Sequence, residues 1–330
     1  TGAAMQCTLS LAAGAQVLKT EASTSSESAL RVRQLSTAVH RDIEDLHKRL
    51  VIMLRSSHGN RREFERVHLV LPFRCVVRGQ LVSGYTADLS SGGALLARLG
   101  GDRLMHTEVA VELPGLGVLP AQVLAVSPAG AHLQFRDLAP QQIERLQERL
   151  IREKQREAGY VERCTRLAAR VAQALAEALA QRRLTQAELF DREYQLVPDT
   201  KPAQFTTRFT ALAEQLLPAL LEAPLGEDPQ IYSCVVVDKN GYAPVHNREY
   251  SMTPRPGDAS WNELHCRSRR LLDDQHGLMA ARSAQPHLVH TYLQPQANGQ
   301  LLMLKEIAAP LWVQERHYGA LRLALRPESA

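Results

Sequence analysis

The chain of 330 residues has few cysteines, few aromatic residues and no long apolar run. Its five cysteines form no CxxC pair, which argues against a disulfide framework and a zinc site and favours a reducing compartment. We therefore expect a cytoplasmic protein. No apolar run approaches the about 18 residues of a membrane-spanning helix. The net charge of +4 is too small to indicate a nucleic-acid-binding protein.

Signatures of the common enzyme classes are also missing. The sequence contains no GxSxG, P-loop, GxGxxG or HExxH pattern, and its 12 histidines are dispersed without ligand spacing. We therefore expect neither an enzyme nor a metal site. A hydrophobic content of 45% with 22% charged residues is typical of a folded protein. At about 150 residues per domain, the length suggests about two domains.

The N-terminal end gives no targeting signal. The first 20 residues have a faintly apolar middle but no basic region, so they make a poor signal peptide. The first residue is Thr1 and not a methionine, so we expect a fragment of a longer protein.

Residues 26–56 have the pattern of one helical stem. Apolar residues recur there with spacings of three and four, at Val32, Leu35, Val39, Ile43, Leu46, Leu50 and Met53. This narrow stripe is typical of a coiled-coil seam, and we expect it to form a homodimer. The alternative is a helix packed on its own globular neighbour. Residues 56–60 (SSHGN) break the helix.

Beyond residue 60 the apolar period falls from about 3.6 to about 2, as in strands. The strand candidates are residues 67–77, 80–88, 93–98, 108–113, 117–126 and 131–135. Gly, Pro, Asp and Ser residues separate them, which is typical of an antiparallel barrel. An amphipathic helix over residues 139–156 follows, with an inward face at Ile143, Leu146, Leu150 and Ile151.

The remainder reads as helices followed by a small α+β domain. Helices are expected over residues 162–181, 185–190 and 205–221, the second with Thr185 as N-cap and Glu188 completing a capping box. Residues 231–237 and 242–246 resemble strands around a DKNG hairpin signal. Residues 261–284 are helical or irregular, and residues 301–309 and 312–325 form a closing hairpin.

Two short motifs carry most of the functional information. RxxxR is formed by Arg62 and Arg66, with Arg61 as a third arginine beside it. DxSxxG is formed by Asp88, Ser90 and Gly93, with Gly92 inside it. Each motif alone is typical of an ordinary solvated turn. Their order, their spacing and their place before and within a strand series favour a joint site.

On these motifs, residues 61–150 resemble the PilZ domain family, bacterial receptors for the second messenger cyclic di-GMP. The resemblance implies a non-enzymatic nucleotide receptor with a β-barrel fold. It implies that the ligand is bound by Arg61, Arg62, Arg66, Asp88, Ser90, Gly92 and Gly93. The acidic Glu63 and Glu65 inside the first motif are expected to weaken affinity for phosphate.

The chemistry of that ligand suits these residue types. Guanine O6 and N7 form an acceptor pair that a guanidinium meets with two hydrogen bonds, and a second arginine can stack on the base or pair with a phosphate. Asp88 can accept hydrogen bonds from guanine N–H groups, and Ser90 can bond either edge. Gly92 and Gly93 allow a positive φ and a close backbone approach.

The C-terminal segment carries further charged groups beside apolar strands. Residues 238–247, 267–274, 305–310 and 317–322 are similar to the PAS/Cache-like sensory segment of some bacterial chemoreceptors. A second ligand pocket is therefore a candidate, lined by His246, Arg267, Arg270, Asp273 and Asp274. The alternative is that these arginines and aspartates pair with each other to fix a helix on the sheet.

Together these patterns predict an α+β protein with three parts. They are a helical stem (residues 1–57), a PilZ-like antiparallel β-barrel with its helix (residues 58–156), and a helical lead-in with a PAS/Cache-like domain (residues 157–330). The expected function is a cyclic di-GMP receptor that couples to motility, chemotaxis or a related output through a signalling partner. The alternative is an adaptor that binds no nucleotide, or a chemoreceptor tail that senses a small molecule through its C-terminal domain.

Overall fold

The computed structural model describes residues 65–97, 99, 104–296 and 299–327, which belong to one unit spanning Glu63–Ala330. The predicted stem, its apolar stripe, and Arg61 and Arg62 lie outside the described residues, so the predicted dimer seam stays a prediction. No helix among the described residues is long and apolar enough to cross a membrane.

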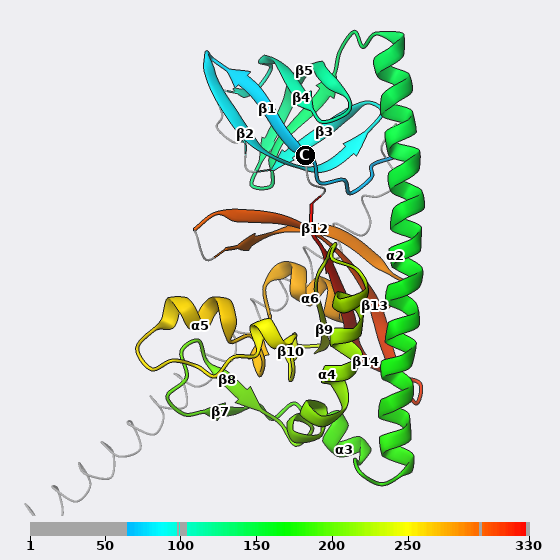
Figure 1. Cartoon of the computed structure of the whole chain (residues 1–330), viewed down its shortest axis with the longest axis vertical. Coiled ribbons are helices and arrows are strands. Elements are labelled where there is room, and N and C mark those ends of the chain that lie inside the picture. The colour runs from blue at the N-terminus through cyan, green and yellow to red at the C-terminus, as the bar shows by residue number, and fades with distance from the viewer. Residues whose placement is uncertain (1–64, 98, 100–103, 297–298, 328–330) are drawn as a thin grey trace, which may run out of the picture. The chain divides into compact units, whose positions relative to one another are not determined.

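The first part of the described chain, up to Phe135, forms a closed antiparallel barrel, as predicted (Figure 1). Its strands are β1 (Pro72–Val77), β2 (Gln80–Ser90), β3 (Gly93–Ala97), β4 (Glu108–Leu113), β5 (Gly117–Ser127) and β6 (Gly130–Phe135). They are hydrogen-bonded in the order β1-β2-β3-β6-β5-β4, with β4 closing on β1. Alternate side chains fill the interior, as the period of two requires.

The chain before β1 differs from the prediction. Residues 67–71 are not part of a strand, apart from an isolated bridge between Val67 and Leu89. The hydroxyl of Thr86, which is fully buried, accepts a hydrogen bond from Leu71 N–H and donates one to the Leu69 carbonyl. A side chain on β2 therefore satisfies backbone groups that a ladder would otherwise pair.

A single helix, α2 (Pro140–Ala180), replaces the two helices expected over residues 139–156 and 162–181. Its 41 residues span about 60 Å at about 1.5 Å per residue. No proline interrupts it, and the one glycine, Gly159, costs about 1 kcal/mol, which does not end a helix that packs on both sides of that position. Figure 1 shows α2 in green, running past the barrel and the second sheet.

The inward face of α2 was only half correctly predicted. Leu146 and Leu150 are buried in the barrel core, whereas Ile143 and Ile151 are 42% and 56% exposed. The buried positions follow one narrow stripe, and the two isoleucines both fall beyond the same edge of it. Further along, the same helix buries a second stripe in another core, comprising Cys164, Leu167, Ala168, Val171, Leu175 and Ala178.

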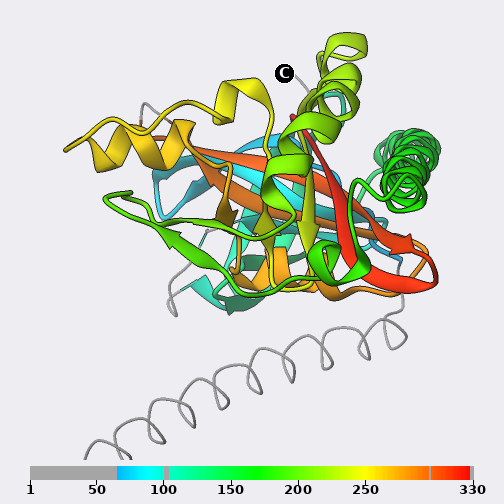
Figure 2. The same ribbon diagram turned by 90° about the horizontal axis from the view of Figure 1, so that it is seen from below.

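That second core lies under a four-stranded antiparallel sheet. The strands β9 (Ile231–Asp238), β12 (Leu288–Pro295), β13 (Leu301–Val313) and β14 (Arg316–Leu325) have the order β12-β13-β14-β9. Helices α2 and α4 (Thr210–Glu227) cover one face, and α6 (Gln275–Arg282) packs on the other (Figure 2). The closing hairpin β13–β14 was predicted; the PAS/Cache resemblance of this part stays a prediction.

Shorter elements surround the sheet. They are α3 (Gln186–Leu189), β7 (Gln195–Val197), β8 (Gln204–Thr206), β10 (Tyr242–Ala243), the 3-10 helix η3 (Arg248–Tyr250), α5 (Ala259–His265) and β11 (Arg270–Leu271). Thr185 caps α3 with Glu188 at N3, as predicted. Phe205 lies in β8, so the helix expected to begin there starts later, at Thr210. That helix also runs through Pro224, where it was expected to end.

The hairpin predicted at the DKNG sequence is wrong. Strand β9 pairs with β14, and β10 pairs with β11 instead of returning along β9. The Asp238 carboxylate, which is fully buried, accepts hydrogen bonds from the N–H groups of Asn240 and Tyr242. The turn is thus closed by a side chain, and the chain leaves the sheet after it.

Candidate functional site

Three of the motif residues lie on neighbouring strand ends at one edge of the barrel. Asp88 and Ser90 end β2, and Gly93 begins β3 opposite Ser90 in the register. Leu89, between them, points into the barrel core with no exposed surface. Since side chains alternate along a strand, Asp88 and Ser90 face the outside of the barrel.

Arg66 reaches the same place from the segment before β1. Its Nη1 atom lies 3.2 Å from Asp88 Oδ2 in an ion pair. Two backbone hydrogen bonds between Val67 and Leu89, of 2.8 and 2.9 Å, fix the position of the chain beside Arg66. The structure therefore brings together the described part of the first motif and the start of the second.

Asp88 keeps one free acceptor. Asp88 is 8% exposed; its Oδ2 atom holds Arg66, and its Oδ1 atom is buried without a hydrogen-bond partner among the described residues. An unpaired carboxylate oxygen away from water carries a free-energy cost of about 1–3 kcal/mol or more. A ligand that offers N–H donors at this point would remove that cost.

Ser90 and Gly93 form the tight corner of the site. The Ser90 hydroxyl donates to the Gly93 carbonyl at 3.2 Å. A Cβ on Gly93 would lie 2.0 Å from the Leu133 carbonyl oxygen, so only glycine fits. The close approach of this backbone to a ligand stays a prediction; the positive φ was not found, because neither Gly92 nor Gly93 is among the described glycines with left-handed backbone.

The acidic residue beside Arg66 has its own partner. Glu65 pairs with Lys154 of α2, with 2.5 Å between Oε2 and Nζ. Both side chains are exposed, at 75% and 46%. Glu65 is thus balanced by a cation that sequence spacing could not reveal, since the two residues are 89 positions apart.

Sequence reasoning also missed His68. Burial lowers the pKa of its imidazole, while the negative charges of Asp88 and Glu157 act in the opposite direction and the positive charge of Lys305 reinforces the lowering. Its Nδ1 atom is buried, and none of the described residues gives it a hydrogen-bond partner. No motif contains His68; only its place two residues after Arg66 could have drawn attention to it.

The candidate second pocket is only partly assembled. His246 is 5% exposed, accepts a hydrogen bond at Nδ1 from Asn247 N–H at 2.8 Å, and lies edge-on to Tyr250. Burial, together with the positive charges of Arg267, Arg322 and Arg270, lowers the pKa of His246 to about 3. The guanidinium of Arg267 lies over the Tyr250 ring, 4.7 Å from its centroid.

The other residues of that pocket serve local structure. Arg270 forms an ion pair of 2.9 Å with Glu263. Asp274 caps α6, accepting from the N–H groups of His276 and Gly277. Asp273 is exposed at the surface. A ligand pocket at these residues stays a prediction. Within the described part of the chain, no cluster of three or more His, Cys, Asp or Glu residues could hold a metal ion.

Comparison with solved structures finds partial likenesses. The PilZ domain of CeSA from a cellulose-synthesising bacterium is 22% identical, covering 26% of this chain and 95% of that one, with a TM-score of 0.24. The PilZ domain of Escherichia coli YcgR with c-di-GMP is 19% identical, covering 31% and 98%, with a TM-score of 0.26. The Bacillus subtilis inhibitor of motility is 18% identical, covering 29% and 52%, with a TM-score of 0.25.

No curated protein matches the chain. The PilZ domain family, in contrast, matches residues 60–152, which include both motifs, the six barrel strands and the first part of α2. Residues 60–152 are therefore a PilZ domain.

Proposed function

We propose that the PilZ domain of this chain binds cyclic di-GMP at Arg66, Asp88, Ser90 and Gly93, with Arg61 and Arg62 completing the site. One observation carries the proposal: among the residues that the structure describes, the buried Oδ1 of Asp88 has no hydrogen-bond partner, while Oδ2 of the same carboxylate holds Arg66. The family match to residues 60–152 supports it, because PilZ domains are a family of cyclic di-GMP receptors.

The chemistry follows from the two groups. Asp88 is an acceptor for the N1–H and N2–H donors of a guanine edge. Arg66, with its side chain 30% exposed, can pair with a phosphate or with O6 and N7 of a guanine. Gly93 adds no side chain to this corner, and its backbone is buried close to that of Leu133.

The proposal extends to a cytoplasmic, non-enzymatic signalling receptor. The sequence resemblance favours an output in motility, chemotaxis or a related response, through a protein partner. The apolar stripe of residues 26–56 favours a homodimer. The candidate pocket at His246 and Arg267 keeps the C-terminal segment as a second, sensory input.

Isothermal titration of cyclic di-GMP tests the nucleotide site. Asp88→Asn keeps the size of the side chain but removes its charge and one acceptor, and we expect affinity to fall at least about tenfold, since a base contact is worth about 1–3 kcal/mol. Glu112→Gln, an exposed carboxylate on β4, is the matched control and should bind as the wild type does. No binding by the wild-type protein, or equal binding by Asp88→Asn, would overturn the proposal.

A further inference from the structure

Residues 65–71, which include Arg66 and lead into β1, lie between the barrel and the second sheet. We name this segment the strap. Val70 of the strap belongs to an apolar cluster that joins the outer face of the barrel to the second sheet. The buried members are Val70, Ala87, Leu95, Ala97 and Met303, with Tyr85 and Leu293 packed against them. The face of the barrel that carries Asp88 is thus partly covered by β12 and β13.

A polar contact lies directly beside the nucleotide residue. Thr291 of β12 donates its hydroxyl hydrogen to the Ala87 carbonyl, with 3.3 Å between Oγ1 and O. The Ala87 backbone also acts on the ring of His68, whose pKa it raises against the larger lowering effect of burial. The second sheet therefore holds the peptide carbonyl just before Asp88.

A buried ion cluster lies on the other side of the strap. Lys305 of β13 is 5% exposed, and its Nζ lies 2.8 Å from Glu153 Oε1 and 2.6 Å from Glu157 Oε2 of α2. Burying one cation with two carboxylates is stable only while the pairing is kept and water is excluded, because an unpaired buried charge costs several kcal/mol.

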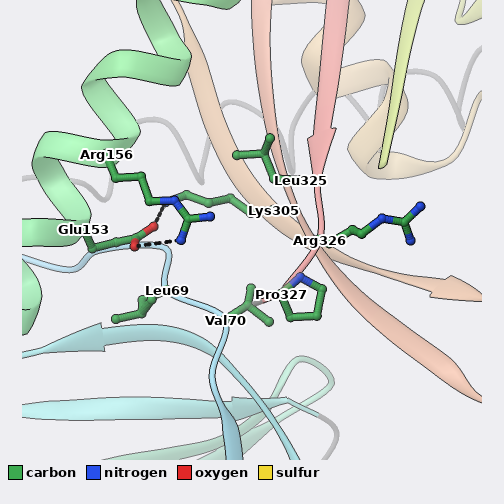
Figure 3. Close-up of a pocket in the computed structure, with 8 residues that line it drawn as sticks. All are labelled: Leu69, Val70, Glu153, Arg156, Lys305, Leu325, Arg326 and Pro327. Carbon is green, nitrogen blue, oxygen red and sulfur yellow. Dashed lines mark hydrogen bonds and ion pairs between the residues drawn. The ribbon is translucent and has the colours of Figure 1, made fainter. Parts of the chain in front are cut away.

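The strap helps to exclude that water. Leu69 and Val70 line the small pocket into which Glu153, Arg156 and Lys305 point (Figure 3). Leu325, Arg326 and Pro327 at the end of β14 close the opposite side, with the Arg326 guanidinium directed away from the cluster. Movement of the strap would therefore open the ion cluster to solvent, and loss of the cluster would loosen the strap.

We propose that the second sheet, through Lys305 and Thr291, holds the strap against the barrel and thereby sets the affinity of the nucleotide site. The strap carries Arg66, and its placement beside Asp88 is preorganised by contacts that the PilZ domain alone does not contain. Nucleotide binding must then act back on the same contacts, because coupling between two sites is reciprocal. The effect on nucleotide affinity rests on the proposed cyclic di-GMP site, whereas the contact between the second sheet and the strap does not.

Hydrogen exchange of the full chain without nucleotide tests the contact. Lys305→Met removes both ion pairs of the cluster, and we expect exchange of the amides in residues 67–71 to rise at least about threefold. Arg166→Met, which removes an exposed ion pair with Glu162 within α2, is the control and should leave the strap unchanged. Thr291→Val removes a single hydroxyl without changing size, so it tests the same contact in a variant that retains the core.

Titration of cyclic di-GMP into the same proteins tests the coupling. Lys305→Met and Thr291→Val should each weaken binding at least about threefold, while Arg166→Met binds as the wild type does. Strap exchange equal to the wild type in both variants would overturn the inference, whatever binds. If the wild type binds no nucleotide but the strap loosens in both variants, the contact is upheld and the proposed function is lost. A loosened strap with unchanged affinity would overturn the coupling.

Discussion

The two carboxylate oxygens of Asp88 differ in their surroundings: Oδ2 lies 3.2 Å from Arg66 Nη1, while Oδ1 is buried with no hydrogen-bond partner in the described part of the chain. The two residues are 22 positions apart, and the Val67–Leu89 bridge holds them in register. Their ion pair is only partly exposed, with side-chain exposures of 30% for Arg66 and 12% for Asp88. A ligand can therefore reach the pair from one side while its other side stays dry.

The arginine of this pair is expected to contribute directly to binding. Arg66→Met keeps most of the aliphatic stem but removes every hydrogen-bond donor of the guanidinium, so its affinity for cyclic di-GMP should fall at least about tenfold. We expect a loss of the same size for Arg62→Ala. Arg74→Met, at an exposed arginine on β1, is the control. Circular dichroism should remain that of the wild type in all three proteins. Wild-type affinity in both site variants would contradict the assignment.

Two glycines are expected to respond to alanine with opposite signs. Gly93→Ala places a Cβ 2.0 Å from a backbone oxygen, so β3 must move from β6, and we expect a loss of at least about 2 kcal/mol in unfolding free energy. Gly159→Ala lies in helix α2 with open space around it, so stability should rise by up to about 1 kcal/mol. Urea denaturation measures both. A stable Gly93→Ala protein would show that this corner is less tight than described.

Acid should destabilise the fold through a buried histidine. The pKa of His246 is about 3 in the folded chain, below the usual value of 6.5. As the pH falls, the imidazole is therefore protonated in the unfolded chain before it is protonated in the folded one. The stability that this group contributes is complete above about pH 6.5 and falls by about 1.4 kcal/mol per pH unit towards pH 3. Burial lowers the pKa of His68 and His290 too, which adds to the same trend.

Urea denaturation between pH 7.5 and pH 5 measures that slope. His246→Asn places an amide oxygen where Nδ1 accepts from Asn247, and it should flatten the dependence on pH. His106→Asn, at an exposed turn residue with left-handed φ, is the control and should keep the wild-type slope. Equal slopes in all three proteins would argue against a neutral buried His246.

A buried thiol on α2 should resist alkylation. Cys164 has no exposed surface, its Sγ lies 3.4 Å from the Ile307 carbonyl oxygen, and burial raises the pKa of the thiol to about 12. Since the thiolate is the nucleophile, iodoacetamide at pH 8 should modify Cys164 at least about 100-fold more slowly in the native protein than in urea. Glu148→Cys supplies an exposed thiol on the same helix for comparison, and peptide mass spectrometry resolves the two. Equal rates at both would mean that α2 does not stay docked on β13.

The barrel could be predicted from sequence because its signals are local. Strand period and turn residues placed most strand ends within a residue or two, and the order and spacing of the two motifs predicted that Arg66, Asp88, Ser90 and Gly93 are neighbours. The same local reasoning failed at residues 238–241, where the turn signal was present but the partner of β10 is a distant segment, β11. It also divided α2 between residues 156 and 162, because no local pattern shows that the helix packs on two cores.

The contacts behind the site were out of reach for the same reason. Lys305 and Glu153 are 152 positions apart, and nothing around either residue indicates that both are buried. His68 likewise follows Arg66 without a motif of its own. Charged residues are usually solvated, so the sequence alone assigns them to the surface unless the fold is known.

Because helix α2 is unbroken, it fixes the angle about its axis between its two buried stripes, each of which packs into a different core. Leu146 and Leu150 enter the barrel core, and the stripe beginning at Cys164 enters the second one. Each residue added to or removed from the helix between Glu157 and Cys164 would turn one stripe by about 100° against the other and shift it by about 1.5 Å. A change of about seven residues would return the stripes to within about 20°, but it would still shift one stripe by about 10 Å along the axis against the other. The number of residues in this part of α2 is therefore constrained, whereas the identity of its solvent-facing side chains is not.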